Sequence, residues 1–312
     1  MSVLVVGSVA YDTVHTAFES RENALGGSAT YFSIACRYFN QVSVVAVVGS
    51  DFRNDDIELF NSQDIDISGL ESTNGNTFRW GGEYELDSNK RKSLFTDLNV
   101  FADFSPSLLS HHKNTDYLFL ANIDPILQLD VIEKMQARPK IIALDSMDFW
   151  INGSLENLIN TIQQIDILFL DETEIRLLSG EQNLIAAIKK IHSMGPHTIV
   201  AKKGEHGVTV FQKDNVFVVP AKILPRVTDP TGAGDAFAGG FMGALSSLEN
   251  ISITGLKHAT LIGAVMGSFA VESFSVDRLK NLSQDEINSR ASEIIKLSNI
   301  ETSLQTKFWN FG

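Results

Sequence analysis

The feature that most constrains the fold is a series of short, uninterrupted apolar runs separated by segments with helical periodicity. Strands that are buried on both faces of a parallel sheet have this continuous hydrophobic character. The runs cover residues 3–6, 42–48, 117–120, 141–144, 167–170 and 198–201, and the helical segments between them cover 28–38, 126–136, 155–164 and 184–192. The alternation predicts a doubly wound α/β fold, with a mostly parallel sheet and helices on both faces.

Residues 74–97 depart from this alternation. Aromatic, β-branched and charged residues mix there, with turn signals at Gly81-Gly82 and at Asp87-Ser88-Asn89. We expect a small antiparallel β lid from this segment and the extended residues 13–18. The last third is mostly helical (residues 232–248, 254–271 and a final helix), and Ser283 with Glu286 predicts a capping box that opens the final helix. We expect residues 1–312 to form one domain.

Composition narrows the class of protein. The chain has 312 residues, 44% of them apolar, and a net charge of −13, so nucleic acid is not expected as a partner. No apolar run approaches the roughly 20 residues of a membrane span, and the apolar start lacks the basic residues of an export signal. The single cysteine, Cys36, excludes an intrachain disulfide and fits a reducing cytoplasm. The seven histidines show no metal-ligand spacing, so no zinc site is expected.

Residues 229–241 carry the clearest chemical signal, Asp-Pro-Thr-Gly-Ala-Gly-Asp followed by small residues. A turn that opens a helix exposes N–H groups and a partial positive charge, which suit an anion. Gly232 and Gly234 let a phosphoryl group approach the backbone, and Asp235 in the first turn suits a base in phosphoryl transfer. A glycine-rich turn with an aspartate cap is the alternative. Dinucleotide-binding and P-loop patterns do not fit, because Phe237 replaces the third glycine and no Gly-Lys pair occurs.

This segment resembles the C-terminal signature of the ribokinase-like (PfkB) carbohydrate kinase family, and four further landmarks follow in the family's order. Residues 7–12 resemble its first strand and sugar-contacting aspartate, and Gly26-Gly27 resembles its N-terminal double glycine. Residues 171–174 are similar to its Asn-x-x-Glu motif, and residues 202–207 to the strand and turn beside the nucleotide.

The resemblance implies an ATP-dependent enzyme that phosphorylates a hydroxyl of a sugar or sugar-like small molecule. Asp235 would be the base and Gly232, Ala233 and Gly234 the anion hole. The expected substrate residues are Asp12, Gly26, Gly27, Tyr31 and Arg79. The expected ATP residues are Asp171, Lys202, Gly204, Gly207, Thr231 and Thr260, and Glu174 would hold Mg²⁺ through water. The lid serves in the family as a substrate cover and often as a dimer interface, so a homodimer through it is expected.

Three positions depart from the family pattern, because Asp171, Tyr31 and Thr260 stand where asparagine is frequent. The acceptor therefore stays open: a sugar, or alternatively a nucleoside or a cyclitol such as inositol. A catalytically silent binding protein is a further alternative, and dependence on a monovalent cation is left open. In the lid, Arg79 and Trp80 should point to opposite faces. We expect Arg79 to face the substrate, and Phe78 and Trp80 to face the lid core or a partner.

Overall fold

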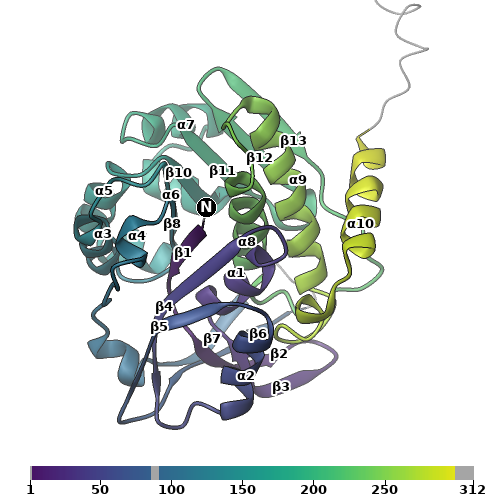
Figure 1. The fold of residues 1–312 in the computed structure, drawn as a ribbon. Helices are drawn as coiled ribbons and strands as arrows, with labels where there is room; N and C mark the ends of the chain where they lie inside the picture. The colour runs from purple at the N-terminus through teal and green to yellow at the C-terminus, as the bar shows by residue number, and fades with distance from the viewer. Residues whose placement is uncertain (1, 86–90, 299–312) are drawn as a thin grey trace, which may run out of the picture.

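The apolar runs form the centre of a nine-stranded sheet in the computed structural model, which describes residues 2–85 and 91–298 (Figure 1). All neighbouring strands from β5 to β11 pair in parallel, whereas β12 and β13 add antiparallel strands at one edge. In spatial order the strands are β13 (Asn215–Val219), β12 (Val208–Gln212), β11 (Thr198–Lys202), β10 (Ile167–Asp171), β9 (Ile141–Asp145), β8 (Tyr117–Leu120), β1 (Ser2–Val6), β4 (Gln41–Gly49) and β5 (Asp66–Thr73).

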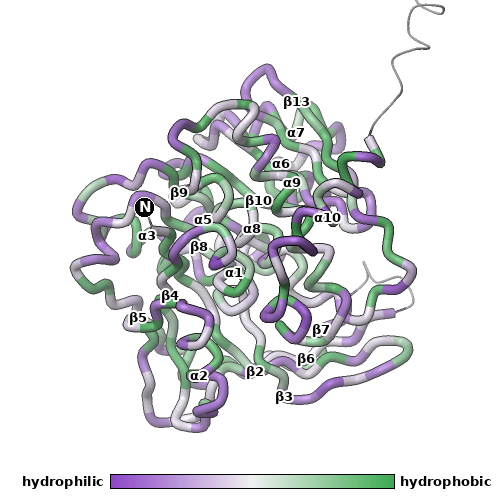
Figure 2. The backbone as a smooth tube through the Cα atoms, turned by 45° about the vertical axis from the view of Figure 1, so that its right-hand side comes forward, coloured by the Kyte–Doolittle hydropathy of each residue, from purple (hydrophilic) through white to green (hydrophobic). Residues whose placement is uncertain are grey.

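Helices cover both faces of this sheet, so alternate residues of each strand enter two different cores (Figure 1). In β1, Val3 and Val5 pack in the core that includes α1 (Ser28–Cys36), α8 (Ala233–Ser246), α9 (Ile253–Ala270) and α10 (Gln284–Leu297). Leu4 and Val6 pack in the core that includes α3 (Pro125–Lys134), α4 (Asp148–Gly153), α5 (Leu155–Ile162), α6 (Glu172–Ser179) and α7 (Leu184–His192). Hydrophobic residues accordingly follow the central strands and α8, while hydrophilic residues follow the outer loops (Figure 2).

A smaller four-stranded sheet, which we call the lid, extends from one end of the main sheet (Figure 1). Its strands, in spatial order, are β3 (Ser20–Gly26), β2 (Ala10–His15), β6 (Phe78–Tyr84) and β7 (Arg91–Asp97). The outer pairs are antiparallel, but the central pair β2–β6 is parallel. The parallel pair arises because the chain leaves the lid after β3, passes through α1, β4, α2 (Asn54–Ser62) and β5, and then returns at β6.

The lid differs from the prediction in its extent. It includes β3, which was not predicted because four of its seven residues are exposed and polar. The predicted turn at Asp87–Asn89 lies outside the described residues. The capping box at Ser283 and Glu286 is confirmed. None of the helices in residues 2–85 and 91–298 is long and apolar enough to cross a membrane.

The short helical turns η1 (Asn99–Asp103), η2 (His112–Asn114), η3 (Gly204–His206) and η4 (Leu279–Asn281) complete the described secondary structure. The parallel strands β1, β4, β9, β10 and β11 all end at the same edge of the main sheet. Side chains at their carboxyl ends therefore meet the first turn of α8 and the inner face of the lid, which is where α/β proteins of this kind bind ligands.

Candidate active site

The last residues of three neighbouring strands bring charged side chains to one place beside the start of α8. Asp145 ends β9, Asp171 ends β10 and Lys202 ends β11, and Asp171 is the direct register partner of Lys202. Asp235 lies in the first turn of α8, which begins at Ala233. The structure thus joins the predicted residues Asp171, Lys202 and Asp235 through the carboxyl ends of parallel strands.

Asp145 is a residue of this site that the sequence prediction missed. Its carboxylate, 4% exposed, accepts two hydrogen bonds from the Lys202 ammonium, at 2.7 and 2.8 Å. Burial alone would lower the pKa of Lys202, but the charge and hydrogen bonds of Asp145, together with the charges of Glu174 and Asp235, outweigh burial and raise it. An apolar run that ends in Asp at the carboxyl edge of a parallel sheet was the available signal, since residues 141–145 read Ile-Ile-Ala-Leu-Asp.

The first turn of α8 is shaped by its glycines. Gly232, the N-cap, has a left-handed backbone with φ of 74°, and a Cβ there would lie 2.3 Å from the Tyr31 ring. Tyr31 is fully buried, so it supports the turn from beneath rather than presenting an open face to a substrate. A Cβ at Gly234 would meet only Lys202, with its Nζ at 3.4 Å, so the ammonium borders this turn. The Ala233 N–H donates to the Pro230 carbonyl at 3.3 Å.

Asp229 and Thr231 hold the loop that leads into α8. The buried Asp229 carboxylate accepts the Thr231 N–H at 2.8 Å, and the Thr231 hydroxyl contacts the Tyr84 hydroxyl of the lid at 3.2 Å. This contact links the lid to the anion-binding turn. Thr231, predicted as an ATP residue, therefore lies between the lid and α8.

Asp12 is buried at the base of the lid, directly against the first residue of the double glycine. A Cβ at Gly26 would lie 2.0 Å from an Asp12 carboxylate oxygen, so only glycine fits there. Gly27, with φ of 93°, caps α1 and donates its N–H to the Asp12 carboxylate. Burial, with the nearby charge of Asp229, raises the pKa of Asp12 to about 7. The predicted residues Asp12, Gly26 and Gly27 thus form one unit.

Asp171 and Glu174 form a reciprocal capping box at the start of α6. The Glu174 carboxylate accepts the Asp171 N–H at 2.7 Å, and the Asp171 carboxylate accepts the Glu174 N–H at 2.8 Å. Both side chains are half-buried and adjoin the Lys202–Asp145 pair. The Asp that replaces the family's asparagine therefore keeps a local structural role as helix cap.

The site holds more buried negative charge than positive. Burial raises the pKa of Glu174 to about 7 and that of Asp235 to about 7, and Asp145 adds to both shifts while Lys202 opposes them. Burial also raises the pKa of Asp229 and of Asp145. With one ammonium among these carboxylates, the site has a surplus of negative charge, which favours a bound proton or a bound cation.

Arg79 is not brought to this cluster, and its predicted orientation is wrong. Tyr11 is the register partner of Arg79, and Asp12 is the partner of Trp80, so Arg79 and Asp12 point to opposite faces of the lid. Arg79 donates to the Asp51 carboxylate at 2.8 Å and to the Asn23 side chain. The inner face instead carries Trp80, which packs with Val14, Tyr84 and Phe274.

Thr260, Gly204 and Gly207 have structural explanations where ATP contacts were predicted. Thr260 is fully buried in α9, and its hydroxyl donates to the Leu256 carbonyl at 2.7 Å. Gly204 and Gly207 have φ of 54° and 85° and form the turn after β11; a Cβ at Gly207 would lie 2.2 Å from the Val219 carbonyl. Their proposed contacts with ATP remain predictions.

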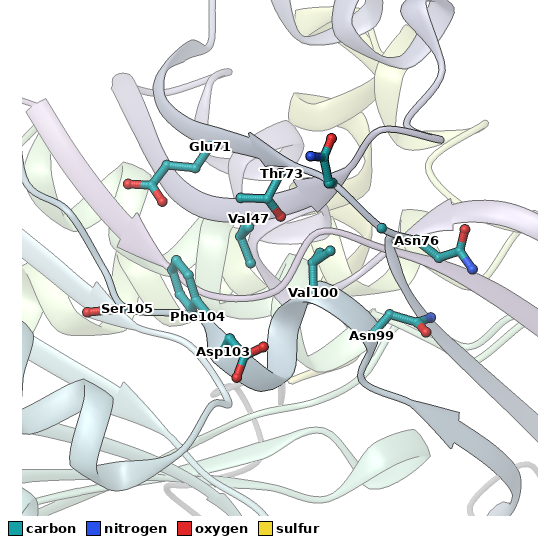
Figure 3. Close-up of a pocket in the computed structure, with 11 residues that line it drawn as sticks. Val47, Glu71, Thr73, Asn76, Asn99, Val100, Asp103, Phe104 and Ser105 are labelled. Atoms are coloured by element: carbon teal, nitrogen blue, oxygen red, sulfur yellow. The ribbon is translucent and has the colours of Figure 1, made fainter.

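A cavity of about 630 Å³ lies elsewhere, between the ends of β4 and β5 and the turn η1 (Figure 3). Polar side chains of Thr73, Asn76 and Asn99 surround Val47 and Val100. None of the predicted site residues lines this cavity. It is therefore separate from the cluster of predicted site residues.

A glycine-lined helix start, a carboxylate in its first turn and a half-buried lysine are the groups that phosphoryl transfer requires. The family model for the pfkB family carbohydrate kinase matches residues 2–281, and this chain belongs to that family. It is a kinase that uses ATP and a hydroxyl acceptor on a sugar or sugar-like molecule. The predicted family, fold and enzyme class are confirmed.

Individual relatives agree with this placement. A cytidine kinase of Thermococcus kodakarensis is 24% identical over 279 residues, which cover 87% of this chain and 99% of the relative. A nucleoside kinase of Methanocaldococcus jannaschii is 26% identical and is matched over 79% of its length and 80% of this chain. The solved structure of the nucleoside kinase from that organism has a TM-score of 0.76 at 22% identity, covering 94% of this chain and 98% of its own.

Proposed function

We propose that this kinase transfers the γ-phosphoryl group of ATP to a ribose hydroxyl of a nucleoside. The observation that carries the proposal is the pairing of Trp80 with Asp12 on the inner face of the lid. A buried carboxylate can accept hydrogen bonds from sugar hydroxyls, and an indole ring beside it can stack on a base. The relatives named cytidine kinase and nucleoside kinase, matched over most of this chain, support the same acceptor.

In the proposed mechanism, Asp235 accepts the proton of the attacking hydroxyl, since it lies at the N-terminal turn that receives the phosphoryl group. The first-turn N–H groups at Gly232, Ala233 and Gly234 stabilise the charge that develops on the transferring group. For Ala233 this requires exchange of its 3.3 Å contact with Pro230. Lys202, beside Gly234, adds a positive charge to the same turn. Closure of the lid excludes water from the site.

The residues present fit a divalent cation. Glu174, Asp171 and Asp145 are neighbouring oxygen donors; burial chiefly raises the pKa of Glu174 to about 7, and the charges of Asp171 and Asp145 add to the rise. Glu174 would hold Mg²⁺ through water, and Mg²⁺ would supply charge neutralisation for the ATP phosphates.

We further propose that the enzyme is cytoplasmic and forms a homodimer through the lid. The exposed side chains of Leu94 and Phe95 on β7 support a contact between two lids.

The test is an acceptor panel assayed for ADP release with Mg²⁺ and ATP. Cytidine, uridine, adenosine, guanosine and inosine are compared with ribose, fructose, 2-dehydro-3-deoxygluconate and myo-inositol. At least one nucleoside should exceed every free sugar and the cyclitol about tenfold in kcat/KM, since stacking of a base is worth about 1–3 kcal/mol. A free sugar or inositol that outperforms all nucleosides would overturn the proposed acceptor and leave the kinase assignment intact. If no acceptor raises ADP release above background, the result would support a catalytically silent relative.

A further inference from the structure

Asp66, His111 and His112 come together at the outer edge of the main sheet, away from the site described above. Asp66 is the first residue of the edge strand β5, and the two histidines lie at η2, between the lid and β8. His111 Nε2 lies 3.0 Å from Asp66 Oδ2, and His112 Nε2 lies 3.6 Å from the same oxygen. The three potential ligand atoms all lie within 4.8 Å of one another.

His112 is the unusual member of this group. The residue is 1% exposed, and its Nε2 atom, directed at the Asp66 carboxylate, makes no hydrogen bond with any described residue. Its nearest acceptor, the Asp66 carboxylate at 3.6 Å, lies beyond hydrogen-bond distance, and a buried ring nitrogen that is so poorly satisfied is unfavourable. His111 and Asp66 are more exposed, at 56% and 38% of their side chains, so the group is accessible from solvent.

We propose that Asp66, His111 and His112 bind a Zn²⁺ ion, with water as the fourth ligand. Two imidazoles and one carboxylate are a donor set that Zn²⁺ accepts, at about 2.0–2.2 Å per ligand. Ligand atoms in a tetrahedron of that size lie roughly 3.3 Å apart. The two separations from Asp66 Oδ2, 3.0 and 3.6 Å, bracket this value.

The carboxylate is held in place by its own partners. Asp66 accepts a hydrogen bond from the Ser43 hydroxyl at 2.8 Å and from the Ser68 N–H at 2.9 Å. Such outer contacts fix the orientation of a metal ligand. Two contacts oppose the metal. The Ser68 hydroxyl lies 3.4 Å from His111 Nε2, and His112 Nδ1 accepts the Leu109 N–H at 3.3 Å, which places the ring proton of His112 on Nε2. Zinc at Nε2 moves that proton to Nδ1 and breaks this long contact.

A metal here would connect two parts of the fold that are distant in the sequence. It would fasten the edge strand β5 to the segment that returns from the lid into β8. An edge strand is the exposed margin of a sheet, and a metal that binds only the folded chain stabilises it. The proposal is therefore a structural zinc site, independent of the phosphoryl-transfer cluster.

The test uses the full chain, with any affinity tag removed and bound metal stripped by a chelator. Zn²⁺ is titrated in competition with a chromophoric chelator, Co²⁺ replaces it for absorption spectroscopy, and thermal unfolding is followed with and without Zn²⁺. The variants are Asp66→Asn, His111→Ala and His112→Ala. His258→Ala, an exposed histidine on α9, is the matched control.

Wild type and His258→Ala should bind one Zn²⁺ per chain, show the intense visible bands of tetrahedral Co²⁺, and unfold at a higher temperature with Zn²⁺. Asp66→Asn and His111→Ala should lose at least roughly 10–100-fold in affinity, the loss that even outer-contact changes cause. Because His112→Ala removes a buried ring and lowers stability by itself, the two more exposed positions decide the result. Zn²⁺ affinity equal in wild type and both variants, or no binding to wild type, would show that the group is only a hydrogen-bonded ion pair.

Discussion

Gly26, Gly232 and Gly234 lie at three close approaches that differ in what a side chain would meet. At Gly26 it would meet the Asp12 carboxylate, and at Gly232 it would meet the Tyr31 ring with a left-handed backbone as well. Substitution at either position therefore disturbs the fold and the site together. Gly234 faces only the flexible Lys202 side chain. It is the glycine at which the anion-binding turn can be blocked while the fold is retained.

Gly234→Val should lower kcat by at least roughly 10²–10³-fold, because blocking the approach to the backbone N–H groups should cost no less than the loss of one donor to a developing oxyanion. The β-branched side chain would occupy the approach of the phosphoryl group and displace the Lys202 ammonium. Gly153→Val is the matched control, because a Cβ at Gly153 meets nothing within 4 Å. Steady-state kinetics and circular dichroism are measured on both variants. Normal turnover by a folded Gly234→Val enzyme would exclude phosphate binding at this turn.

Asp235→Asn tests the base. The amide keeps the shape of the side chain but cannot accept the proton of the hydroxyl, and a positioned base contributes roughly 10²–10⁴-fold to the rate. We expect kcat to fall by that factor while the KM for ATP changes little. Turnover within a few-fold of wild type would contradict the assignment.

Among the elements, the ends of β9 and β11 tune the acidity of Asp235 from opposite directions. Asp145 raises the pKa of Asp235 and Lys202 lowers it, with burial as the largest cause of the overall rise to about 7. The base must be ionised, so kcat/KM should increase as pH rises through about 7. Substitutions at the ends of β9 and β11 should therefore move this acid limb of the pH profile in opposite directions.

Asp145→Asn should shift the acid limb of kcat/KM to lower pH, and Lys202→Met should shift it to higher pH. Lys203→Met, which removes a charge paired with Glu172 outside the cluster, should leave the limb in place. The pH dependence of kcat/KM is measured for all three. Damage to the site alone would lower the rate without moving the limb, and shifts of the same sign would contradict the electrostatic coupling.

Trp80 and Arg79 lie on opposite faces of β6, so substitutions at the two positions should have different effects. Trp80→Ala should raise the KM for a nucleoside roughly tenfold, because stacking on a base is lost, while the KM for ATP stays unchanged. Arg79→Ala removes the ion pair with Asp51 on the opposite face and should lower the unfolding temperature without changing the acceptor KM. An acceptor KM that responds to Arg79 and not to Trp80 would restore the orientation predicted from the sequence.

The lid also shows where sequence reasoning reaches its limit. Apolar runs such as residues 117–120 predicted the central strands closely, because burial on both faces leaves an unbroken hydrophobic signal. Strand alternation at Arg79 and Trp80 predicted opposite faces, but the choice between the faces depends on pairing with β2, which is distant in the sequence. Asp145 was missed for the same reason, since its partner Lys202 is 57 residues away.

At the scale of the whole molecule, acidic groups fall into two classes with opposite effects on stability. Glu286, whose side chain is 41% exposed, accepts hydrogen bonds from Ser283 and Arg278 that lower its pKa to about 2. Asp12, Glu174 and Asp235 are instead raised to about 7, chiefly by burial. The site thus retains carboxylates in an environment that disfavours their charge, which fits a site built to receive a cation with the nucleotide.

This division predicts that the free enzyme is most stable in mild acid. Between the unfolded pKa of about 4 and the folded pKa of about 7, the folded chain binds more protons than the unfolded chain, so the free energy of unfolding falls as pH rises. Carboxylates with a lowered pKa, such as Glu286, have the opposite effect on the free energy of unfolding. The stability that they contribute is lost only as pH falls through about 2. The unfolding temperature should therefore decrease from pH 5 to pH 7, the window set by these shifts. Asp12→Asn should flatten the decrease in unfolding temperature, whereas the exposed Asp55→Asn should keep it.

Mg²⁺ and ATP should raise the unfolding temperature more at the alkaline end, where the carboxylates are ionised and need a cation most. An unfolding temperature that rises steadily from pH 5 to pH 7 without ligand would mean that these carboxylates are ionised and compensated by the fold itself.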